Sequence, residues 1–346
     1  MASRQSQLIK TGPLAPFFVV CLLFLLGGCS SSETSHQFAG PTMGTSYHVT
    51  LIAAELPKGL DRQIADVLED INQQMSTYRD NSLLMQFNRA PLGEPFRLSV
   101  DLMNVLVLAG DIYRQTEGAF DPTVGPLVNL WGFGPDYHED QVPDGEAITA
   151  LVKGLGFDGV LLDSATTEAT RLEDISLDLS AIAKGYAADK VAELLRDHGI
   201  NRYMVEVGGE MALSGKNSRN TPWKIAIEKP VTGVRDVQQI VAFTDVGVAT
   251  SGDYRNYFEK DGKRYSHTLD PRTGYPISHN LASVTVAAQS SALADGLATA
   301  FMVMGTEKAL AFAEAHSIAI MTLSKTESGF EAGYSSAFMP YLEEAN

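Results

Sequence analysis

Two residues near the carboxyl end of the chain have the types and spacing of a cation site. Asp295 and Thr299 lie four residues apart in segment 292–304, which we expect to be a helix capped by Ser291. A carboxylate and a hydroxyl at this spacing project from one helix face. Their hard oxygen atoms suit Mg²⁺, which shares its other positions with water and substrate phosphates. The same pair also occurs in ordinary helices, where the aspartate is simply solvated.

A second candidate lies at the start of another expected helix, 181–197, with Ser180 as its N-cap. Helix N-termini offer unpaired N–H groups and a positive dipole end, and both favour a phosphate. Lys184 falls in the first turn, where a cation is unfavourable unless an anion lies nearby. The alternative is an exposed lysine beside a capped helix.

A third candidate is His267, which is expected where a strand enters the turn 270–274. Histidine is the side chain best suited to move a proton near neutral pH, although a lone histidine is often structural. Tyr78 follows an amphipathic helix and could pack in the core or offer an aromatic face to a flat ligand. Nucleophile-elbow, Walker A and dinucleotide-fingerprint motifs are absent from the sequence.

The elements that must position these residues do not alternate strictly between helix and strand. This order favours an α+β fold over a Rossmann-type sheet. Hydrophobic spacing predicts helices at 60–75, 100–116, 144–155, 181–197, 292–304 and 307–316. It predicts strands at 47–52, 203–207, 211–214, 223–228, 239–243, 247–250, 281–288 and 318–323. Segment 121–135 is rich in Gly and Pro and is expected to be a structured loop.

The amino terminus has the pattern of a processed leader. Arg4 and Lys10 precede an apolar run, 14–26, that is too short to span ~30 Å of hydrocarbon. The run ends in Leu26-Gly27-Gly28-Cys29, which resembles the lipobox of bacterial lipoproteins. We expect a signal peptide at 1–28, acylation of Cys29, a flexible tether at 29–38 and one domain at 39–346. An ordinary signal peptide is the alternative.

Composition excludes some partners. The chain has 346 residues, with 26 Lys+Arg against 42 Asp+Glu, and a formal charge of −16. Without a basic cluster, this charge would repel nucleic acid. Removal of 1–28 would leave 318 residues and, with two cations lost, a charge of −18. Cys21 lies in the leader and Cys29 would be lipidated, so the chemistry should use oxygen and nitrogen groups.

Taken together, eight short segments resemble the ApbE family of FAD:protein FMN transferases over about residues 38–340. They are MGT at 43–45, MSTYR at 75–79 with FN at 87–88, FDPTVGP at 120–126, DLSAIAKGYA at 178–187, GG at 208–209, TSGDY at 250–254, HTLDPRTG at 267–274 and ADGLATA at 294–300. The resemblance implies an α+β fold of mixed or antiparallel sheets flanked by helices.

The resemblance also implies an activity: transfer of the FMN half of FAD to a Thr or Ser hydroxyl of another protein, with release of AMP. It implies that Asp295, Thr299 and the carbonyl of Ala181 hold Mg²⁺, and that His267 takes the proton of the acceptor hydroxyl. The FAD contacts that it implies are Met43, Tyr78, Ala119, Phe120, Asp121, Asp178, Lys184 and the backbone of Leu269.

Partners and location follow from the same resemblance. The acceptors would be flavoprotein subunits, such as those of membrane redox pumps. The protein would then be lipid-anchored in the bacterial cell envelope and face the periplasm, with the inner membrane favoured. Two other functions stay open: a membrane-anchored flavin-binding or flavin-storage protein, and a Mg²⁺-dependent FAD pyrophosphatase. The sequence does not name the acceptor.

Overall fold

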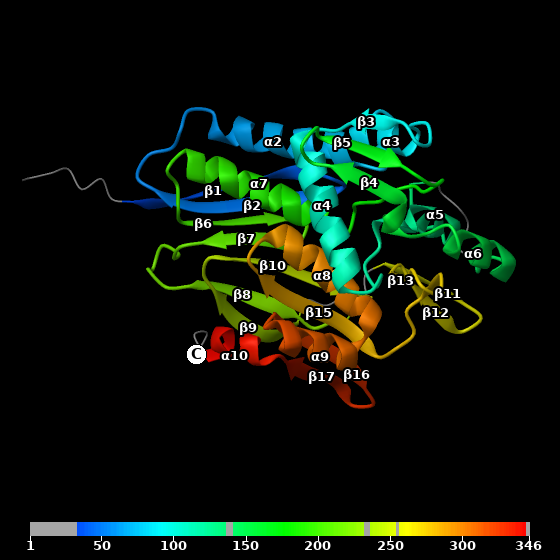
Figure 1. The fold of residues 1–346 in the computed structure, drawn as a ribbon. Coiled ribbons are helices and arrows are strands. Elements are labelled where there is room, and N and C mark those ends of the chain that lie inside the picture. The colour runs from blue at the N-terminus through cyan, green and yellow to red at the C-terminus, as the bar shows by residue number, and fades with distance from the viewer. Residues whose placement is uncertain (1–32, 136–140, 232–235, 254–255, 344–346) are drawn as a thin grey trace, which may run out of the picture.

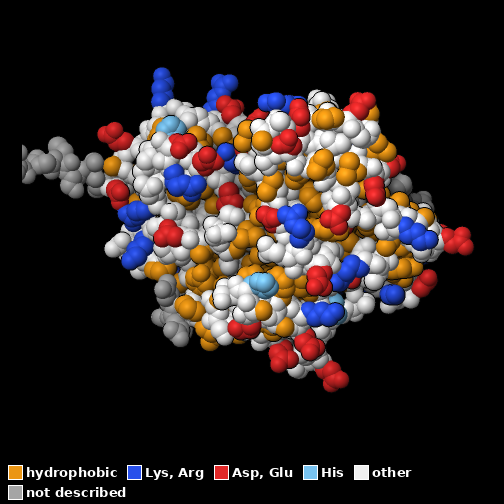
Figure 2. All heavy atoms as spheres, viewed as in Figure 1, with side chains coloured by type: hydrophobic (Ala, Val, Ile, Leu, Met, Phe, Trp, Pro, Cys, Tyr) orange, Lys and Arg blue, Asp and Glu red, His pale blue; other side chains and the backbone are white. Residues whose placement is uncertain are grey.

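The computed structural model describes residues 33–135, 141–231, 236–253 and 256–343. The expected leader, Cys29 and Tyr254 lie outside these ranges. Within them, no helix is both long and apolar enough to cross a membrane. The face of the protein in Figure 2 carries acidic and basic side chains interspersed with apolar ones, rather than one continuous basic patch.

The framework of the fold is an eight-stranded sheet in which every neighbouring pair is antiparallel (Figure 1). Its strands, in spatial order, are β1 (Thr34–Thr42), β2 (Thr45–Ala53), β6 (Tyr203–Val207), β7 (Glu210–Ser214), β10 (Val246–Gly252), β15 (Leu281–Ala288), β16 (Ala319–Thr326) and β17 (Gly329–Tyr334). This arrangement confirms the expected α+β class.

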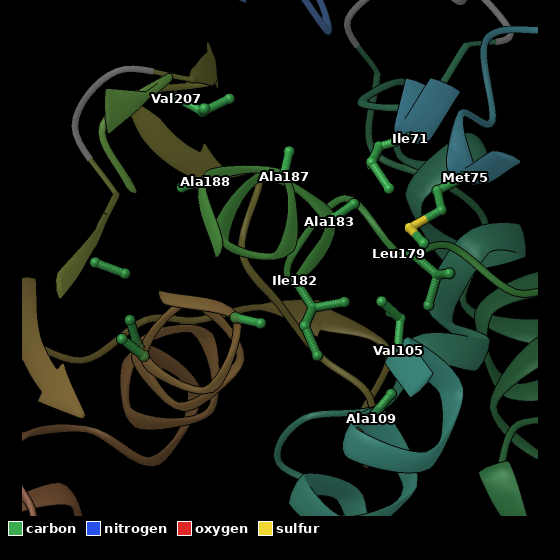
Figure 3. Close-up of a cluster of buried hydrophobic side chains, with 14 of the residues drawn as sticks. Ile71, Met75, Val105, Ala109, Leu179, Ile182, Ala183, Ala187, Ala188 and Val207 are labelled. Carbon is green, nitrogen blue, oxygen red and sulfur yellow. The ribbon is translucent and has the colours of Figure 1, made fainter. Parts of the chain in front are cut away.

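Helices cover one face of this sheet: α2 (Leu60–Met75), α4 (Val100–Gln115), α7 (Ala183–Asp197), α8 (Ser291–Met304) and α9 (Thr306–His316). Alternate strand residues point toward them, as Tyr203, Val205 and Val207 of β6 do. Figure 3 shows the start of α7, with Ile182 and Ala183, among side chains of this buried cluster. Burial of this apolar surface holds the helices on the sheet.

The opposite face packs against a hairpin of β8 (Trp223–Glu228) and β9 (Val237–Phe243), with α10 (Met339–Glu343) beside it. Trp223 and Ile227 of β8 belong to the same buried cluster as Leu213 and Val248 of the sheet. The large sheet therefore has two cores, one on each face.

Smaller elements connect and cover this framework. They are α3 (Leu83–Asn88), β3 (Pro95–Arg97), α5 (Gly125–Leu130), α6 (Gly145–Val152), β4 (Val160–Asp163), β5 (Glu168–Arg171), β11 (Tyr257–Lys260), β12 (Lys263–Ser266), β13 (Leu269–Asp270), β14 (Tyr275–Pro276) and 3₁₀ turns at Pro122–Val124, Phe157–Gly159 and Ser336–Phe338. The expected loop 121–135 thus contains one of these turns and α5.

Three local expectations require correction. Helix α7 begins at Ala183, and its N-cap is Ile182 rather than Ser180. In α8 the capping side chain is Ser290, whose Oγ accepts the Leu293 N–H at 3.2 Å, and Ser291 is the first helical residue. The expected tether, 29–38, ends earlier, because strand β1 begins at Thr34 and pairs with β2 from there on.

Candidate active site

A single cavity of about 1020 Å³ lies at the end of the sheet where β6 and β10 end and β2 and β7 begin. It is lined by all the predicted metal, FAD and catalytic residues except Met43: Tyr78, Ala119, Phe120, Asp121, Asp178, Ala181, Lys184, His267, Leu269, Asp295 and Thr299. The fold therefore brings together segments that lie more than two hundred residues apart in the sequence.

Met43 lies in the two-residue turn between β1 and β2 and does not line the cavity. Met43 and Gly44 have φ values of 47° and 73°, as the tight turn of a twisted hairpin requires. Met43 packs against the core on the helix side of the sheet. The residues that follow the turn, Thr45 and Ser46, line the cavity instead.

A second turn that contains glycine, between β6 and β7, packs against the side chain of Lys184. Gly208 has a φ of 62°, and its N–H donates to the carbonyl of Ser46 at 3.0 Å. A Cβ atom on Gly208 would lie 2.8 Å from Cγ2 of Thr45 and 3.1 Å from Cδ of Lys184. A side chain here would be strained by both the backbone and the lack of space, so this turn requires glycine.

Helices α7 and α8 cross closely, which joins the two motifs expected to hold the metal and the phosphates. A Cβ atom on Gly185 would lie 2.4 Å from the carbonyl oxygen of Ser291. The carboxylate of Asp189, on α7, accepts the N–H groups of Ser291 and Ala292 at 2.9 Å each. It thereby satisfies two of the unpaired donors at the start of α8.

Lys184 lies between two buried carboxylates. Its Nζ is 3.6 Å from Oε1 of Glu210 and 4.0 Å from Oδ2 of Asp295. Burial raises the pKa of Asp295, and it raises the pKa of Glu210 to about 8, although Lys184 opposes both shifts. Burial alone would lower the pKa of Lys184, but the two carboxylates outweigh it and raise that pKa. The cluster therefore contains one ammonium group, that of Lys184, and two carboxyl groups, those of Glu210 and Asp295.

Glu210 directly follows the Gly-Gly motif singled out in the sequence, but it was not among the residues predicted for the site. Its side chain is buried, it lines the cavity, and its Oε2 has no hydrogen-bond partner among the described residues. Burial of an oxygen atom without a hydrogen bond is costly unless the oxygen is protonated or accepts a hydrogen bond from a ligand. The available signal was an acidic residue directly after a Gly-Gly turn, which is also what an ordinary exposed hairpin contains.

The oxygen donors predicted to hold Mg²⁺ are chemically suited to it. Asp295 is 3% exposed, and Thr299 and Ala181 line the same cavity. A carboxylate, a hydroxyl and a main-chain carbonyl are all hard ligands, and Mg²⁺ needs few of them from protein. Within the described ranges there is no cluster of three or more His, Cys, Asp or Glu side chains that could form a different metal site.

His267 follows strand β12 and is oriented by a backbone carbonyl. Its Nδ1 lies 3.0 Å from the carbonyl oxygen of Asn256, which also accepts the His267 backbone N–H at 3.1 Å. A carbonyl can only accept, so Nδ1 carries the proton and Nε2 has the lone pair. Burial lowers the pKa of His267, so the neutral ring dominates at neutral pH.

Aromatic packing supports the loop that carries His267. The Trp131 indole N–H donates to the carbonyl of Gly274 at 2.8 Å, and its ring packs against Tyr265 with centroids 5.6 Å apart. Phe133 meets the His267 ring edge-on at 6.3 Å. Residues of the 121–135 segment therefore hold this loop against the cavity.

The remaining predicted FAD contacts include two aspartates that organise loops. Asp121 Oδ1 accepts the N–H and the hydroxyl of Thr123 at 2.8 and 2.7 Å, and burial raises the pKa of its carboxyl. Asp178 Oδ1 accepts the Ser180 N–H at 2.8 Å, which shapes the turn before α7. Tyr78, by contrast, is 70% exposed at the cavity rim, where an aromatic face is available to a ligand.

The α+β fold and the residues that line this cavity agree with the enzyme class that the sequence resemblance implies, a flavin transferase. A family model described as the ApbE family matches residues 43–322, and the chain belongs to that family. The chain is 46% identical over 325 residues to the FAD:protein FMN transferase of Vibrio cholerae O395, covering 93% of this chain and 97% of that one. It is 39% identical over 308 residues to the Escherichia coli K12 protein of that name, covering 88% of each.

Two solved structures have the same fold. The flavin transferase ApbE from Vibrio cholerae superimposes with a TM-score of 0.82 at 45% identity, covering 90% of this chain and 100% of that one. The apo form of the Pseudomonas stutzeri flavinyl transferase ApbE gives 0.82 at 38% identity, covering 90% and 97%. The family resemblance and fold predicted from the sequence are confirmed.

Proposed function

We propose that this protein transfers FMN from FAD to a Thr or Ser hydroxyl of an acceptor protein and releases AMP, in a reaction that depends on Mg²⁺. The observation that carries the proposal is the common cavity of His267, Lys184 and Asp295, which combines a neutral base, a cation and a metal-type carboxylate. The names of the relatives support the choice of FAD as the donor.

Asp295, Thr299 and the carbonyl of Ala181 would hold Mg²⁺ in this reaction. When bound, Mg²⁺ neutralises charge on the pyrophosphate oxygens of FAD. The N-terminal turn of α7 and the ammonium of Lys184 add positive potential on the same side of the cavity. These groups explain how a chain of charge −16 could bind an anionic dinucleotide.

His267 would act as the general base. As the acceptor hydroxyl oxygen attacks the phosphorus of the FMN half, Nε2 takes the hydroxyl proton. A bond forms between that oxygen and phosphorus, the bond from phosphorus to the bridging oxygen breaks, and AMP leaves with the bridging oxygen. Tyr78 would offer its exposed ring to the isoalloxazine, and Glu210 an acceptor for one of the hydroxyl or N–H donors of FAD.

The experiment that tests this proposal mixes the purified protein, FAD, Mg²⁺ and an exported flavoprotein domain. Intact mass spectrometry then measures the acceptor, and chromatography measures the released nucleotide. An FMN mass increment on the acceptor together with AMP supports transfer. Free FMN and AMP without the increment would indicate an FAD pyrophosphatase instead, and recovery of intact FAD would indicate a flavin-binding protein.

We also propose that the mature protein is anchored by a lipid on Cys29 and works at the periplasmic side of the bacterial cell envelope, with the inner membrane favoured. The support is the lipobox-like Leu26-Gly27-Gly28-Cys29 and the small, polar residues that follow. Cells fed a clickable palmitate should label the wild type but not Cys29→Ser. Equal labelling of both, or a soluble labelled protein, would contradict the anchor.

A further inference from the structure

The first turn of α8, the helix that carries Asp295, is held by a side chain of another helix. Oδ1 of Asp189, on α7, accepts the Ser291 N–H, and Oδ2 accepts the Ala292 N–H, each at 2.9 Å. A helix N-terminus is usually capped by the residue just before the helix. Asp189 lies 102 residues before Ser291 in the chain, so its two hydrogen bonds also tie α7 to α8.

A second contact between the same two helices lies one turn away. Gly185 and Asp189 are four residues apart on α7, so they lie on one face of that helix. The Gly185 N–H donates to Oδ2 of Asp295 at 3.0 Å, and Asp295 lies four residues after Ser291 on α8. The two contacts are therefore one turn apart on both helices. Together they oppose sliding and rotation of α8 against α7.

Close backbone packing encloses the start of α8 on two sides. A Cβ atom on Gly247 of β10 would lie 2.1 Å from the carbonyl carbon of Ser290, and one on Gly185 would lie 2.4 Å from the carbonyl oxygen of Ser291. Such van der Waals contacts limit how closely α8 approaches its neighbours, but they depend little on direction. Hydrogen bonds do depend on direction, so the bonds of Asp189 fix the orientation of the first turn.

We infer that Asp189 is a positioning residue for the metal site: it holds the first turn of α8 so that the Asp295 carboxylate, one turn later, lies where Mg²⁺ is proposed to bind. Asp189 does not line the cavity, so it acts through α8 and not on the ligand itself. The inference rests on the proposed function, because the role of Asp295 as a Mg²⁺ ligand belongs to that proposal. Residues that orient metal ligands typically contribute about 10- to 100-fold to metal affinity.

Three variants separate positioning from simple capping. Asp189→Ala removes both hydrogen bonds to α8, and Asp189→Asn keeps one acceptor oxygen, which makes it the milder variant if Asp189→Ala does not fold. The matched control is Ser290→Ala, because the Oγ of Ser290 caps α8 from within its own segment by accepting the Leu293 N–H at 3.2 Å. All three variants lose a cap and should have a lower Tm. Only the Asp189 variants loosen α8 from α7.

Two measurements on the purified proteins report on the position of Asp295. Calorimetric titration with Mg²⁺ should give a Kd that is about 10- to 100-fold higher in Asp189→Ala and nearly unchanged in Ser290→Ala. Hydrogen exchange of the Gly185 amide, followed by NMR without metal, reports on its bond to Asp295, because N–H groups in the first turn of a helix have no partner within the helix. This exchange should become about tenfold faster in Asp189→Ala and stay unchanged in Ser290→Ala.

The outcomes separate this inference from the proposed function. If the wild type binds no Mg²⁺, the metal part of the proposed function fails, and the Gly185 exchange still decides the role of Asp189. If the wild type binds Mg²⁺ and the Asp189 variants keep both its Kd and the Gly185 exchange rate, the inference alone fails. It is also overturned if Ser290→Ala weakens Mg²⁺ binding equally, which would indicate capping alone. A weaker Kd with unchanged Gly185 exchange would overturn it too, because Asp189 would then act through its charge.

Discussion

The backbone N–H of Gly185 donates a hydrogen bond to Oδ2 of Asp295 at 3.0 Å. This contact joins the start of α7, where Lys184 lies, to the α8 carboxylate proposed to bind Mg²⁺. It is possible only because Gly185 has no side chain, since the α8 backbone passes where a Cβ atom would be. The lysine proposed to attract the phosphates and the carboxylate proposed to bind Mg²⁺ are therefore held in one rigid unit.

We expect Gly185→Ala to separate the two helices. A methyl group 2.4 Å from the carbonyl oxygen of Ser291 must push α8 away, at a cost of about 2 kcal/mol in the free energy of unfolding. A shift of ~1 Å in Asp295 should lower the transfer rate by about 100-fold. Urea unfolding and initial transfer rates measure the two effects.

The control for this prediction is Gly154→Ala. A Cβ atom there would lie 3.5 Å from its nearest neighbour, the carbonyl oxygen of Leu151, which is ordinary contact. This variant should keep wild-type stability and rate. Wild-type activity in Gly185→Ala would show that the close crossing does not position the site.

His267→Gln should lower the rate of FMN transfer by about 10²- to 10⁴-fold while FAD still binds, because the base is lost and the cavity remains. In the wild type, burial lowers the pKa of His267 below its ordinary 6.5. The neutral form that can accept a proton is therefore already dominant at pH 6.5, and the rate should fall only at lower pH.

A pH profile of kcat and FAD titration by fluorescence check both parts of this prediction. His198→Gln is the control, because His198, the C-cap of α7, is hydrogen-bonded to Gln63 of α2 and does not line the cavity. A low-pH fall in kcat that persists unchanged in His267→Gln would assign the base to another group.

Mg²⁺ should stabilise the wild type but not Asp295→Asn. A ligand that binds only the folded state at 100 times its Kd adds about 2.7 kcal/mol to the free energy of unfolding. Loss of the buried carboxylate removes one proposed ligand and its charge, so the shift in Tm with Mg²⁺ should disappear. EDTA should reverse the shift in the wild type.

Differential scanning fluorimetry with and without Mg²⁺ measures this shift. Asp66→Asn is a suitable control, because Asp66 lies exposed on α2 in an ion pair with Arg62. The same Mg²⁺ shift in Asp295→Asn and the wild type would move the metal site elsewhere.

Glu210 should make the protein less stable as the pH rises from about 4.5 to about 8. Burial raises the pKa of its carboxyl from the ordinary 4.5 to about 8 in the folded protein. Between these values the unfolded chain has lost the proton while the folded protein keeps it, so deprotonation favours unfolding. Glu210→Gln has no proton to lose, and its stability should increase relative to the wild type across this range.

Urea unfolding of both proteins at pH 5, 6.5 and 8 tests this prediction. The difference in the free energy of unfolding between the variant and the wild type should grow steadily with pH. A constant difference at the three pH values would mean that Glu210 is already ionised in the folded state at pH 5.

Local periodicity determined several elements of this protein from the sequence alone. The spacing of Leu60, Ile64, Leu68, Ile71 and Met75 predicted α2 with its observed bounds, because each of these residues is buried on one helix face. The strand Trp223–Glu228 was also predicted correctly. The caps were less predictable, since Ser290 and Ser291 are adjacent residues of the same good capping type, and only the structure shows that Ser290 is the cap.

The residue types alone also predicted a metal site at Asp295 and Thr299. They predicted a phosphate site near Lys184 and a general base at His267, and the eight motifs predicted the family. Only the tertiary structure decided that Glu210 is buried beside Lys184, that Met43 stays outside the cavity, and that residues of β8 line it. Burial, pKa and access depend on which distant segments meet, as Gly185 and Asp295 do across 110 residues. Local residue patterns carry no information about these long-range contacts, and the packing of the two helices against the sheet creates them.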